Sequence, residues 1–408
     1  MSASLVILGR LPGLGTAELE SVFGADKLHA ASSQAVSLDV DPGEIDFKRF
    51  GGAVKLCKLL TTLKTTNWKA IEKYLIQTSP DQAKNLPEGK MHLGLSMYGL
   101  SVGPKQLLAT GLSIKKAVQR ETSKSVRLVP NKTAELNAAQ ILHHRLTGGN
   151  GWELVLVRSG DKTLLGQTVA AQDIDAYAAR DFDRPKRDAK VGMLPPKLAQ
   201  IIVNLSVSNA DPAHGGVLLD PFCGTGVILQ EATLMGFDVY GSDLDPRMVD
   251  YTDKNLLWLM GQPFSTIHRP DEYADDATWR YFRLEQGDAT THQWSPAPSF
   301  VASETYLGRP FTSMPSAEIL AQTIAECNTI LRKFLQNIQP QLQPGARLCL
   351  AIPAWQVRPN EFKHLPLIDL LSDLGYNQVR FTHVRDTGLL YYRPDQIVAR
   401  ELLVITRK

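Results

Sequence analysis

The chain has 408 residues, and at roughly 150 residues per domain this length predicts two or three domains rather than one. Hydrophobic residues make up 43% of the chain and charged residues 21%, which excludes a disordered, collagen-like or coiled-coil protein. The 44 basic and 42 acidic residues leave a formal net charge of +2, so the total charge neither requires nor excludes a polyanionic partner.

The first 170 residues alternate between short strand patterns and helix patterns. The apolar run Leu5–Leu8 predicts a strand, and the residues after it predict a helix over Thr16–Phe23. Further strands are predicted at Ala35–Val40, His92–Ser96, Val126–Val129, Glu153–Arg158 and Thr163–Val169. This mixed pattern indicates an α+β region.

Basic residues gather within the second half of this region. Residues 101–150 contain eight basic and two acidic side chains, a local excess of +6. Such a stretch suits contacts with RNA phosphates, although a solvated helix face is the alternative. The residues that we assign to RNA binding are Lys115, Lys116, Arg120, Lys124, Arg127 and Lys132.

Residues 171–196 form a polar, charged segment that predicts an interdomain linker. Strand and helix patterns then alternate from residue 197 onward, and this alternation predicts an α/β domain with a doubly wound, mostly parallel sheet. Strands are predicted at Val217–Leu219 and Asp238–Gly241, and a third strand at Phe282–Leu284. Helices are predicted at Val227–Met235 and Pro246–Met260.

A long amphipathic helix and two final strands follow. The helix is predicted because apolar residues recur at steps of three and four, which places them on one face that should pack in the core. These residues are Leu320, Ile324, Cys327, Leu331, Phe334 and Ile338. The final strands are predicted at Gln378–Val384 and Glu401–Ile405.

The segment Leu218-Leu-Asp-Pro-Phe-Cys-Gly-Thr-Gly226 joins an apolar strand to a glycine turn and a helix. This is the layout of a ligand site at the carboxyl end of a strand. Gly224 and Gly226 allow the backbone to approach a ligand closely, and the helix start near Val227 supplies free N–H groups. We therefore expect the main ligand site here.

Aspartates at three successive strand ends indicate which ligand this site binds. Asp220, Asp243 and Asp288 would gather at one crevice, where three carboxylates would repel a pyrophosphate. The third glycine of a dinucleotide fingerprint is also replaced, by Leu229. S-adenosylmethionine, with its ammonium and sulfonium cations and its ribose hydroxyls, fits better. The alternative is that the glycines make a plain turn and the aspartates cap helices.

These residues resemble the class I S-adenosylmethionine-dependent methyltransferases, and among them the THUMP-domain tRNA guanine-N2 methyltransferases that act on the guanosine at position ten. The motifs Asp220–Gly226 and Gly241–Pro246 are similar to the first two motifs of the family, and Arg187–Ala199 is similar to the segment that precedes its catalytic domain. The resemblance implies a Rossmann-like methyltransferase domain over 197–408, a THUMP-like RNA-binding domain over 61–170, and an N-terminal α+β segment over 1–60.

The resemblance also implies roles for individual residues. Asp220, Phe222 and the Gly224-Thr225-Gly226 turn would hold the methionine part of the cofactor. Asp243 with Leu244 would take the ribose hydroxyls, and Asp288 with Ala289 would contact the adenine.

The target-base motif departs from the family. Relatives carry Asp/Asn-Pro-Pro-Tyr/Phe after the fourth strand, whereas this chain reads Ser303-Glu-Thr-Tyr306 without either proline. One alignment puts Ser303 at the acceptor position and Tyr306 at the aromatic one, and a shift by one residue puts Glu304 at the acceptor position. Glu304 could accept from the target amine and Tyr306 could stack on a flipped base. The alternative is a structural salt bridge, with Arg309 as its partner.

We therefore expect a cytoplasmic enzyme that methylates RNA, with tRNA guanosine as the substrate and S-adenosylmethionine as the cofactor. A methyltransferase for another RNA or DNA target, or a non-catalytic RNA-binding protein that retains the fold, are the alternatives. The four cysteines form no CxxC pair and no apolar run reaches the roughly 18 residues of a membrane span, so we expect a reducing compartment, no metal and no membrane. The family resemblance also allows a small activator protein as a partner.

Overall fold

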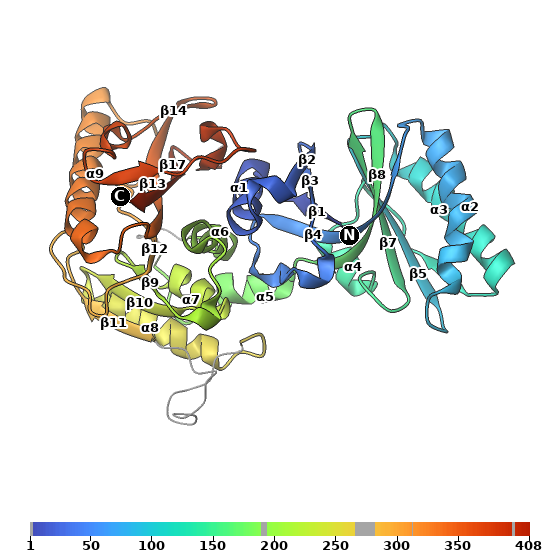
Figure 1. Ribbon diagram of the computed structural model, residues 1–408, viewed down its shortest axis with the longest axis horizontal. Coiled ribbons are helices and arrows are strands. Elements are labelled where there is room, and N and C mark those ends of the chain that lie inside the picture. The colour runs from blue at the N-terminus through green and yellow to red at the C-terminus, as the bar shows by residue number, and fades with distance from the viewer. Residues whose placement is uncertain (1–2, 189–193, 266–281, 312, 394–395) are drawn as a thin grey trace. The chain divides into compact units, whose positions relative to one another are not determined.

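The computed structural model describes residues 3–188, 194–265, 282–311, 313–393 and 396–408. The chain divides into two compact units (Figure 1). The first comprises Met1–Thr16, Gly24–Lys48 and Gly52–Asp175, and the second comprises Ala17–Phe23, Arg49–Gly51 and Ala176–Lys408. Within the described residues, none of the helices is both long and apolar enough to cross a bilayer.

The first unit is built on one sheet with the strand order β2-β3-β1-β4-β8-β7-β5-β6. Its strands are β1 (Ser4–Leu8), β2 (Leu28–Ser32), β3 (Ala35–Leu38), β4 (Ala53–Leu63), β5 (Met91–Tyr98), β6 (Val126–Leu128), β7 (Gly151–Ser159) and β8 (Lys162–Ala171). Its helices are α2 (Trp68–Lys84), α3 (Pro104–Thr122) and the short α4 (Ala138–His143), while α1 (Pro12–Phe23) passes from the first unit into the second. The apolar sides of α2 and α3 pack against β5 and β7 (Figure 1).

Strands from the predicted segments 1–60 and 61–170 share this sheet. The long strand β4 pairs with β1 on one side and with β8 on the other, in antiparallel register from Lys55 opposite Ala171 to Leu63 opposite Thr163. Because backbone hydrogen bonds of the ladder join the two segments, neither one has a complete sheet of its own. All six strands predicted up to residue 170 are present within a few residues of their predicted bounds.

The second unit is an α/β fold. Its sheet runs in the order β11-β10-β9-β12-β13-β17-β15, in which β17 is antiparallel to its neighbours and β14 and β16 pair at the side. The strands are β9 (Val217–Asp220), β10 (Asp238–Asp243), β11 (Phe282–Gln286), β12 (Phe300–Glu304), β13 (Arg347–Arg358), β14 (Glu361–Lys363), β15 (Tyr376–Gln378), β16 (Leu390–Tyr391) and β17 (Val398–Arg407).

Helices cover both faces of this sheet. They are α6 (Pro196–Val207), α7 (Val227–Leu234), α8 (Pro246–Met260) and α9 (Ala317–Ile338), and the short helix α5 (Ile174–Ala178) precedes them along the chain. The apolar stripe of α9 packs with Trp294, Trp355 and strand residues such as Leu348 in one core on its side of the sheet (Figure 1). All six residues of the predicted stripe are buried, so that prediction is confirmed.

The predicted strand Gln378–Val384 is wrong for most of its length. Strand β15 ends at Gln378, and the backbone beyond Val379 leaves the sheet. The N–H groups of Thr382 and His383 instead donate to the carboxylate of Glu20, at 2.5 and 2.9 Å. A side chain more than 300 residues away thus replaces the strand partner, which periodicity along the chain cannot reveal.

A second glutamate ties the early part of the chain into the second unit. Glu18 is buried, and its Oε1 accepts from the Gly51 N–H at 2.9 Å and from Nδ2 of Asn204 at 2.8 Å. Asn204 lies on α6, and its Nδ2 also donates to the carbonyl of Arg49 at 2.9 Å. These bonds satisfy the buried backbone groups of residues 49–51, and they explain why those residues belong to the second unit.

Candidate active site

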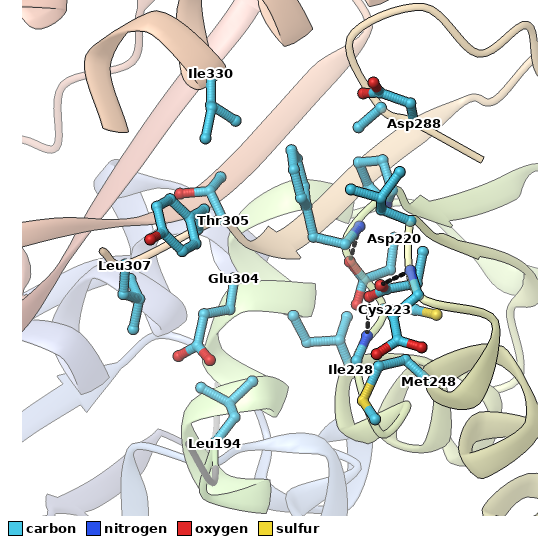
Figure 2. Close-up of a pocket in the computed structure, with 18 of the residues that line it drawn as sticks. Leu194, Asp220, Cys223, Ile228, Met248, Asp288, Glu304, Thr305, Leu307 and Ile330 are labelled. Atoms are coloured by element: carbon cyan, nitrogen blue, oxygen red, sulfur yellow. Dashed lines mark hydrogen bonds between the residues drawn. The ribbon is translucent and has the colours of Figure 1, made fainter. Parts of the chain in front are cut away.

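The site lies where the strand order of the second sheet reverses. Strand β9 has β10 on one side and β12 on the other. The loops that follow the carboxyl ends of β9 and β12 therefore run in opposite directions and leave a crevice between them. A cavity of about 800 Å³ occupies this position, within the size range of pockets for drug-sized ligands. Figure 2 shows side chains from both loops around it.

The glycine turn between β9 and α7 has the tight geometry that its sequence predicts. Gly224 and Gly226 both have positive φ angles, 52° and 78°. The Gly226 N–H donates to the Cys223 carbonyl at 2.7 Å, and a Cβ on Gly226 would lie 2.7 Å from Cγ2 of Thr252. Only glycine fits this position without strain. Gly226 itself does not line the cavity, so its contribution is the shape of the turn.

Asp243 joins the turn to the second strand. Its Oδ2 accepts from the Gly224 N–H at 2.9 Å and its Oδ1 accepts from the Asp245 N–H at 3.0 Å. Burial raises the pKa of the Asp243 carboxyl above its usual value, although these backbone hydrogen bonds oppose the rise. Each oxygen keeps a lone pair for a further donor, and the neighbouring Leu244 is 68% exposed at the cavity.

Asp220 and Ser303 connect the two strands that flank the crevice. Ser303 is fully buried, and its Oγ donates to Oδ1 of Asp220 at 2.6 Å. The Phe222 N–H donates to the same oxygen at 3.2 Å. Burial raises the pKa of Asp220 to about 7, and the nearby carboxylates of Asp243 and Glu304 act in the same direction. Ser303 lies behind the wall of the cavity, where it contacts Asp220 rather than a substrate.

Asp288 lies on the same side of the cavity as Asp220 (Figure 2), two residues after the end of β11. Its Oδ1 accepts from the backbone N–H of Thr290 at 2.9 Å and from the Thr290 hydroxyl at 2.8 Å. These hydrogen bonds lower the pKa of the Asp288 carboxyl, so it is ionised at neutral pH. Ala289 is buried beside it, and both residues line the cavity.

The end of β12 forms the other wall. Glu304, Thr305, Tyr306 and Leu307 all line the cavity, so the alignment with Glu304 at the acceptor position agrees better with its geometry than the one with Ser303. Tyr306 is 40% exposed at the cavity, and partial burial raises the pKa of its phenol. The ring therefore stays neutral at physiological pH and can stack on a base.

The proposed salt-bridge partner of Glu304 is corrected by the structure. Its Oε1 accepts from Nε of Arg400 on β17, and the two side chains are only 16% and 10% exposed. Arg309 instead lies 3.6 Å from Glu326 on α9. Arg309 was the expected partner because it is close to Glu304 along the chain, whereas Arg400 reaches Glu304 across the sheet.

Helix α9 adds cavity residues that the sequence did not single out. Thr329, Ile330 and Lys333 line the cavity from the stripe beside the buried one. Figure 2 places Ile330 across the cavity from Leu194. Lys333 contributes a positive charge near Asp288. A helix pattern predicts the core face, but which flank meets a cavity depends on the sheet below it.

The segment before the catalytic domain is tied to the glycine turn. Asn255 on α8 donates from Nδ2 to the carbonyls of Thr225 and Lys186, at 2.8 and 2.9 Å, and its Oδ1 accepts from the Lys186 N–H. Arg180 forms a buried ion pair with Glu231 on α7 at 2.7 Å. The predicted linker 171–196 thus contacts the helix that follows the cofactor turn, while residues 189–193 of the Arg187–Ala199 motif lie outside the described part.

The basic residues assigned to RNA binding are all in the first unit. Lys115, Lys116 and Arg120 lie on α3, Arg127 lies on β6, and Lys132 lies in the loop after it. All of these except Lys115 are exposed. Lys124 differs, because its Nζ donates to the carbonyls of Leu86 and Pro87 at 2.7 and 2.8 Å. Its ammonium is therefore engaged within the unit.

The cavity residues fit S-adenosylmethionine. The carboxylates of Asp220, Asp243 and Asp288 suit its cationic groups and its hydroxyl donors. Apolar side chains complete the lining and can flank an adenine ring; they are Phe222, Ile228, Leu244 and Met248. A side chain would not fit at Gly226 of the glycine turn, and the absence of side chains at its glycines allows the backbone to approach a ligand closely. Cys223 is buried, which raises the pKa of its thiol and disfavours a nucleophilic thiolate.

Comparisons with known proteins agree with this geometry. Residues 184–259, which include the glycine turn, match the family model of the RMKL-like methyltransferase domain. The tRNA (guanine(10)-N2)-dimethyltransferase of Methanothermobacter thermautotrophicus is 36% identical over 164 residues, which cover 40% of this chain and 39% of that protein. The corresponding enzyme of Methanocaldococcus jannaschii is 48% identical over 65 residues, 16% of this chain and 17% of that one. The matches thus span well under half of the length of these relatives.

Solved structures share the fold over nearly the whole chain. The crystal structure of a possible methylase from Clostridium difficile 630 matches with a TM-score of 0.52 and 11% identity, over 99% of this chain and 98% of that one. The structure of SMU.472 complexed with SAH matches with a TM-score of 0.50 and 13% identity, over 100% and 99%. The predicted class I methyltransferase fold is confirmed, and so is the resemblance to tRNA guanine-N2 methyltransferases. The THUMP assignment of residues 61–170 stays a prediction.

Proposed function

We propose that this protein transfers a methyl group from S-adenosylmethionine to the exocyclic amine of a guanosine in tRNA. The observation that carries the proposal is the cavity in which an acidic glycine turn faces the acceptor and aromatic side chains at the end of β12. The class I methyltransferase fold and the names of the relatives matched over part of the chain support it.

When bound, the cofactor would supply an electrophilic methyl group carried on a positively charged sulfur. Asp220, Phe222 and the Gly224-Thr225-Gly226 turn would hold the methionine part. Asp243 and Leu244 would bind the ribose, and Asp288 and Ala289 the adenine. The contribution of the chain is to align the two reactants.

Glu304 and Tyr306 would orient the target base. The lone pair of a base amine is delocalised into the ring, so the amine needs an acceptor that turns this lone pair toward the methyl group. Glu304 offers a carboxylate at the cavity wall, and Tyr306 offers an exposed ring beside it. Ser303 would act indirectly, by fixing Asp220.

The first unit would hold the tRNA. Within the described residues, the cations of Lys115, Lys116, Arg127 and Lys132 make no ion pair or hydrogen bond, whereas Lys124 contacts two carbonyls and Arg120 pairs with Glu121. RNA is recognised largely through its shape and phosphates. The requirement for a small activator protein, which the family resemblance allows, stays a prediction. Turnover by the purified chain alone would argue against it.

The test is incubation with methyl-labelled S-adenosylmethionine and unmodified tRNA, followed by nuclease digestion and identification of the labelled nucleoside. We expect labelled N2-methylguanosine, and we expect Glu304→Gln to lower turnover by about 100-fold or more because it weakens the acceptor. Glu361→Gln, on the exposed strand β14, is the matched control and should retain activity. Label on another nucleoside would assign a different target.

The second candidate is an RNA-binding protein that retains the fold without turnover. It is favoured by the loss of both prolines from the target motif and by the ion pair that already engages Glu304. Cofactor affinity does not distinguish the two candidates, because an inactive chain can still bind the cofactor. Calorimetric binding of S-adenosylmethionine together with the absence of label on any tRNA, ribosomal RNA or DNA would favour this candidate.

A further inference from the structure

The ion pair between Glu304 and Arg400 joins two strands that are not neighbours. Strand β13 lies between β12 and β17, and the register places Glu304 opposite Ala351, which in turn lies opposite Leu402. Alternate residues of a strand share a face, so Arg400, two residues before Leu402, lies on the face of Glu304. The ion pair with Glu304 therefore spans β13 on this face of the sheet.

The pair is shielded from solvent yet lies at the cavity wall. The side chains of Arg400 and Glu304 are 10% and 16% exposed, so both charges have lost most of their hydration. Such a pair contributes little net stability, because desolvation offsets the attraction, but it fixes geometry. Glu304 lines the cavity, whereas Arg400 does not. Arg400 can therefore act on a substrate only through Glu304.

The carboxylate of Glu304 retains accepting capacity toward the cavity. Arg400 binds Oε1, and within the described residues no other hydrogen bond to this carboxylate is present. Figure 2 shows the carboxylate projecting away from the strand toward Leu194, into the space between the two walls. A carboxylate has about four acceptor sites and no donor when ionised, so the group offers acceptors only.

Purine bases differ in what they offer to such a group. Guanine presents the N1–H and the 2-amino group side by side, which gives two adjacent donors for a carboxylate. Adenine presents its amine beside an N1 lone pair, which an acceptor-only group repels. An amide such as glutamine would tolerate both arrangements, because it contains a donor as well as an acceptor.

We propose that Arg400 is a positioning residue that fixes Glu304 as an acceptor-only group, and that Glu304 in this pose selects bases with N–H donors at both the ring and the exocyclic position. This inference rests on the proposed function and names the residues that would give the enzyme its base specificity. It assigns a role to a residue that lies almost 100 positions away from the target motif and outside the cavity lining.

The test uses tRNA in which the guanosine labelled by the unaltered protein is replaced by 2-aminopurine. This base keeps the 2-amino group but has an N1 lone pair in place of N1–H. We expect its methylation to be slower by about 100-fold or more, because the lone pair would face an acceptor-only group. 6-Thioguanosine also alters position 6 but keeps N1–H, so it should be methylated within a few-fold of guanosine.

Variants then assign the effect to the ion pair. Glu304→Gln should reduce the guanosine to 2-aminopurine ratio to within a few-fold of one, and Arg400→Met should lower it substantially while Arg400→Lys retains most of it. Arg358→Gln, which removes an exposed arginine at the end of β13, is the matched control. Calorimetric affinity for S-adenosylmethionine should stay unchanged in the three arginine variants, since Arg400 and Arg358 do not line the cavity.

Folding and specificity are separated by the double variant. Arg400→Met leaves a buried carboxylate unpaired, which destabilises the fold. Glu304→Gln with Arg400→Gln removes both charges and should fold while losing the discrimination. Equal methylation of guanosine and 2-aminopurine by the unaltered protein would overturn the inference, as would full discrimination by folded Arg400→Met. Absence of label on any guanosine would instead overturn the proposed function itself, and the inference with it.

Discussion

The two walls of the cavity are built in different ways. On the cofactor wall, the turn Asp220–Gly226 is one continuous segment whose geometry comes from two positive φ angles and from nearby backbone donors. On the opposite wall, Glu304 depends on Arg400, and the cavity residues of α9 come from a third part of the chain. The glycine turn is encoded in one short motif, whereas the wall that contains Glu304 depends on strand order and register.

The largest effect is expected from a substitution at Gly226 in the glycine turn. Gly226→Ala should abolish measurable S-adenosylmethionine binding and lower the free energy of unfolding by about 2–5 kcal/mol, because the residue has a positive φ and its Cβ would clash with Thr252. Calorimetry and urea denaturation measure the two effects. Gly261→Ala is the control, since its Cβ would meet only the Trp258 carbonyl, at 3.5 Å, and its φ is −85°. Equal behaviour of the two variants would contradict this account.

The next prediction concerns the carboxyl that links the two walls. Burial raises the pKa of Asp220 to about 7 in the folded state, while an unfolded aspartate titrates near its ordinary value of about 4. The folded state therefore binds more protons between these values, so this group's stability contribution is present below pH 4 and is lost as the pH rises toward 7. The loss is about 1.4 kcal/mol per pH unit within this window.

Asp220→Asn removes this titration and measures it. The difference in unfolding free energy between Asp220→Asn and the unaltered protein should grow in favour of the variant from pH 4 to pH 7 and then level off. Urea denaturation at each pH gives the difference. A difference that does not change with pH would show that Asp220 is not protonated in the folded state at these pH values.

A smaller effect is expected at Asp243. Asp243→Asn should weaken S-adenosylmethionine binding by about 1–2 kcal/mol, because an amide can accept only one of the two backbone N–H bonds that the carboxylate oxygens now accept. Isothermal titration measures the change. Asp250→Asn, on the exposed side of α8 in an ion pair with Lys254, should leave the affinity unchanged. The assignment of Asp243 to the cofactor fails if both variants bind equally well.

The smallest effect is expected at Arg309, the residue that the sequence suggested as the salt-bridge partner of Glu304. Arg309→Gln should change the free energy of unfolding by less than about 0.5 kcal/mol, because its contact with Glu326 is exposed and 3.6 Å long. A double-mutant cycle between Glu304 and Arg309 should likewise give no measurable coupling, in contrast to the cycle between Glu304 and Arg400. Strong coupling of Glu304 to Arg309 would mean that the two arginines exchange partners in solution.

The same contrast explains what could be predicted from the sequence. The six strands predicted up to residue 170, the turn at Gly226 and the buried stripe of α9 follow from local propensity and periodicity, and all are present, whereas β2 and β4 were not predicted. The partner of Glu304 could not be predicted, because it depends on β17 lying two strands from β12. The end of β15 was missed for a similar reason, since the donors of Thr382 and His383 are taken by Glu20.

The path of the chain between the two units limits how the protein can be divided. Residues 17–23 and 49–51 belong to the second unit, so the polypeptide enters it twice before residue 176. A fragment that begins at residue 176 would lack Glu18 and leave Nδ2 of Asn204 without that acceptor. A fragment that begins at residue 61 would remove most of β4 and leave β8 as a bare sheet edge. Gene fusions, truncations and separate expression of either unit must therefore start from the intact amino-terminal region.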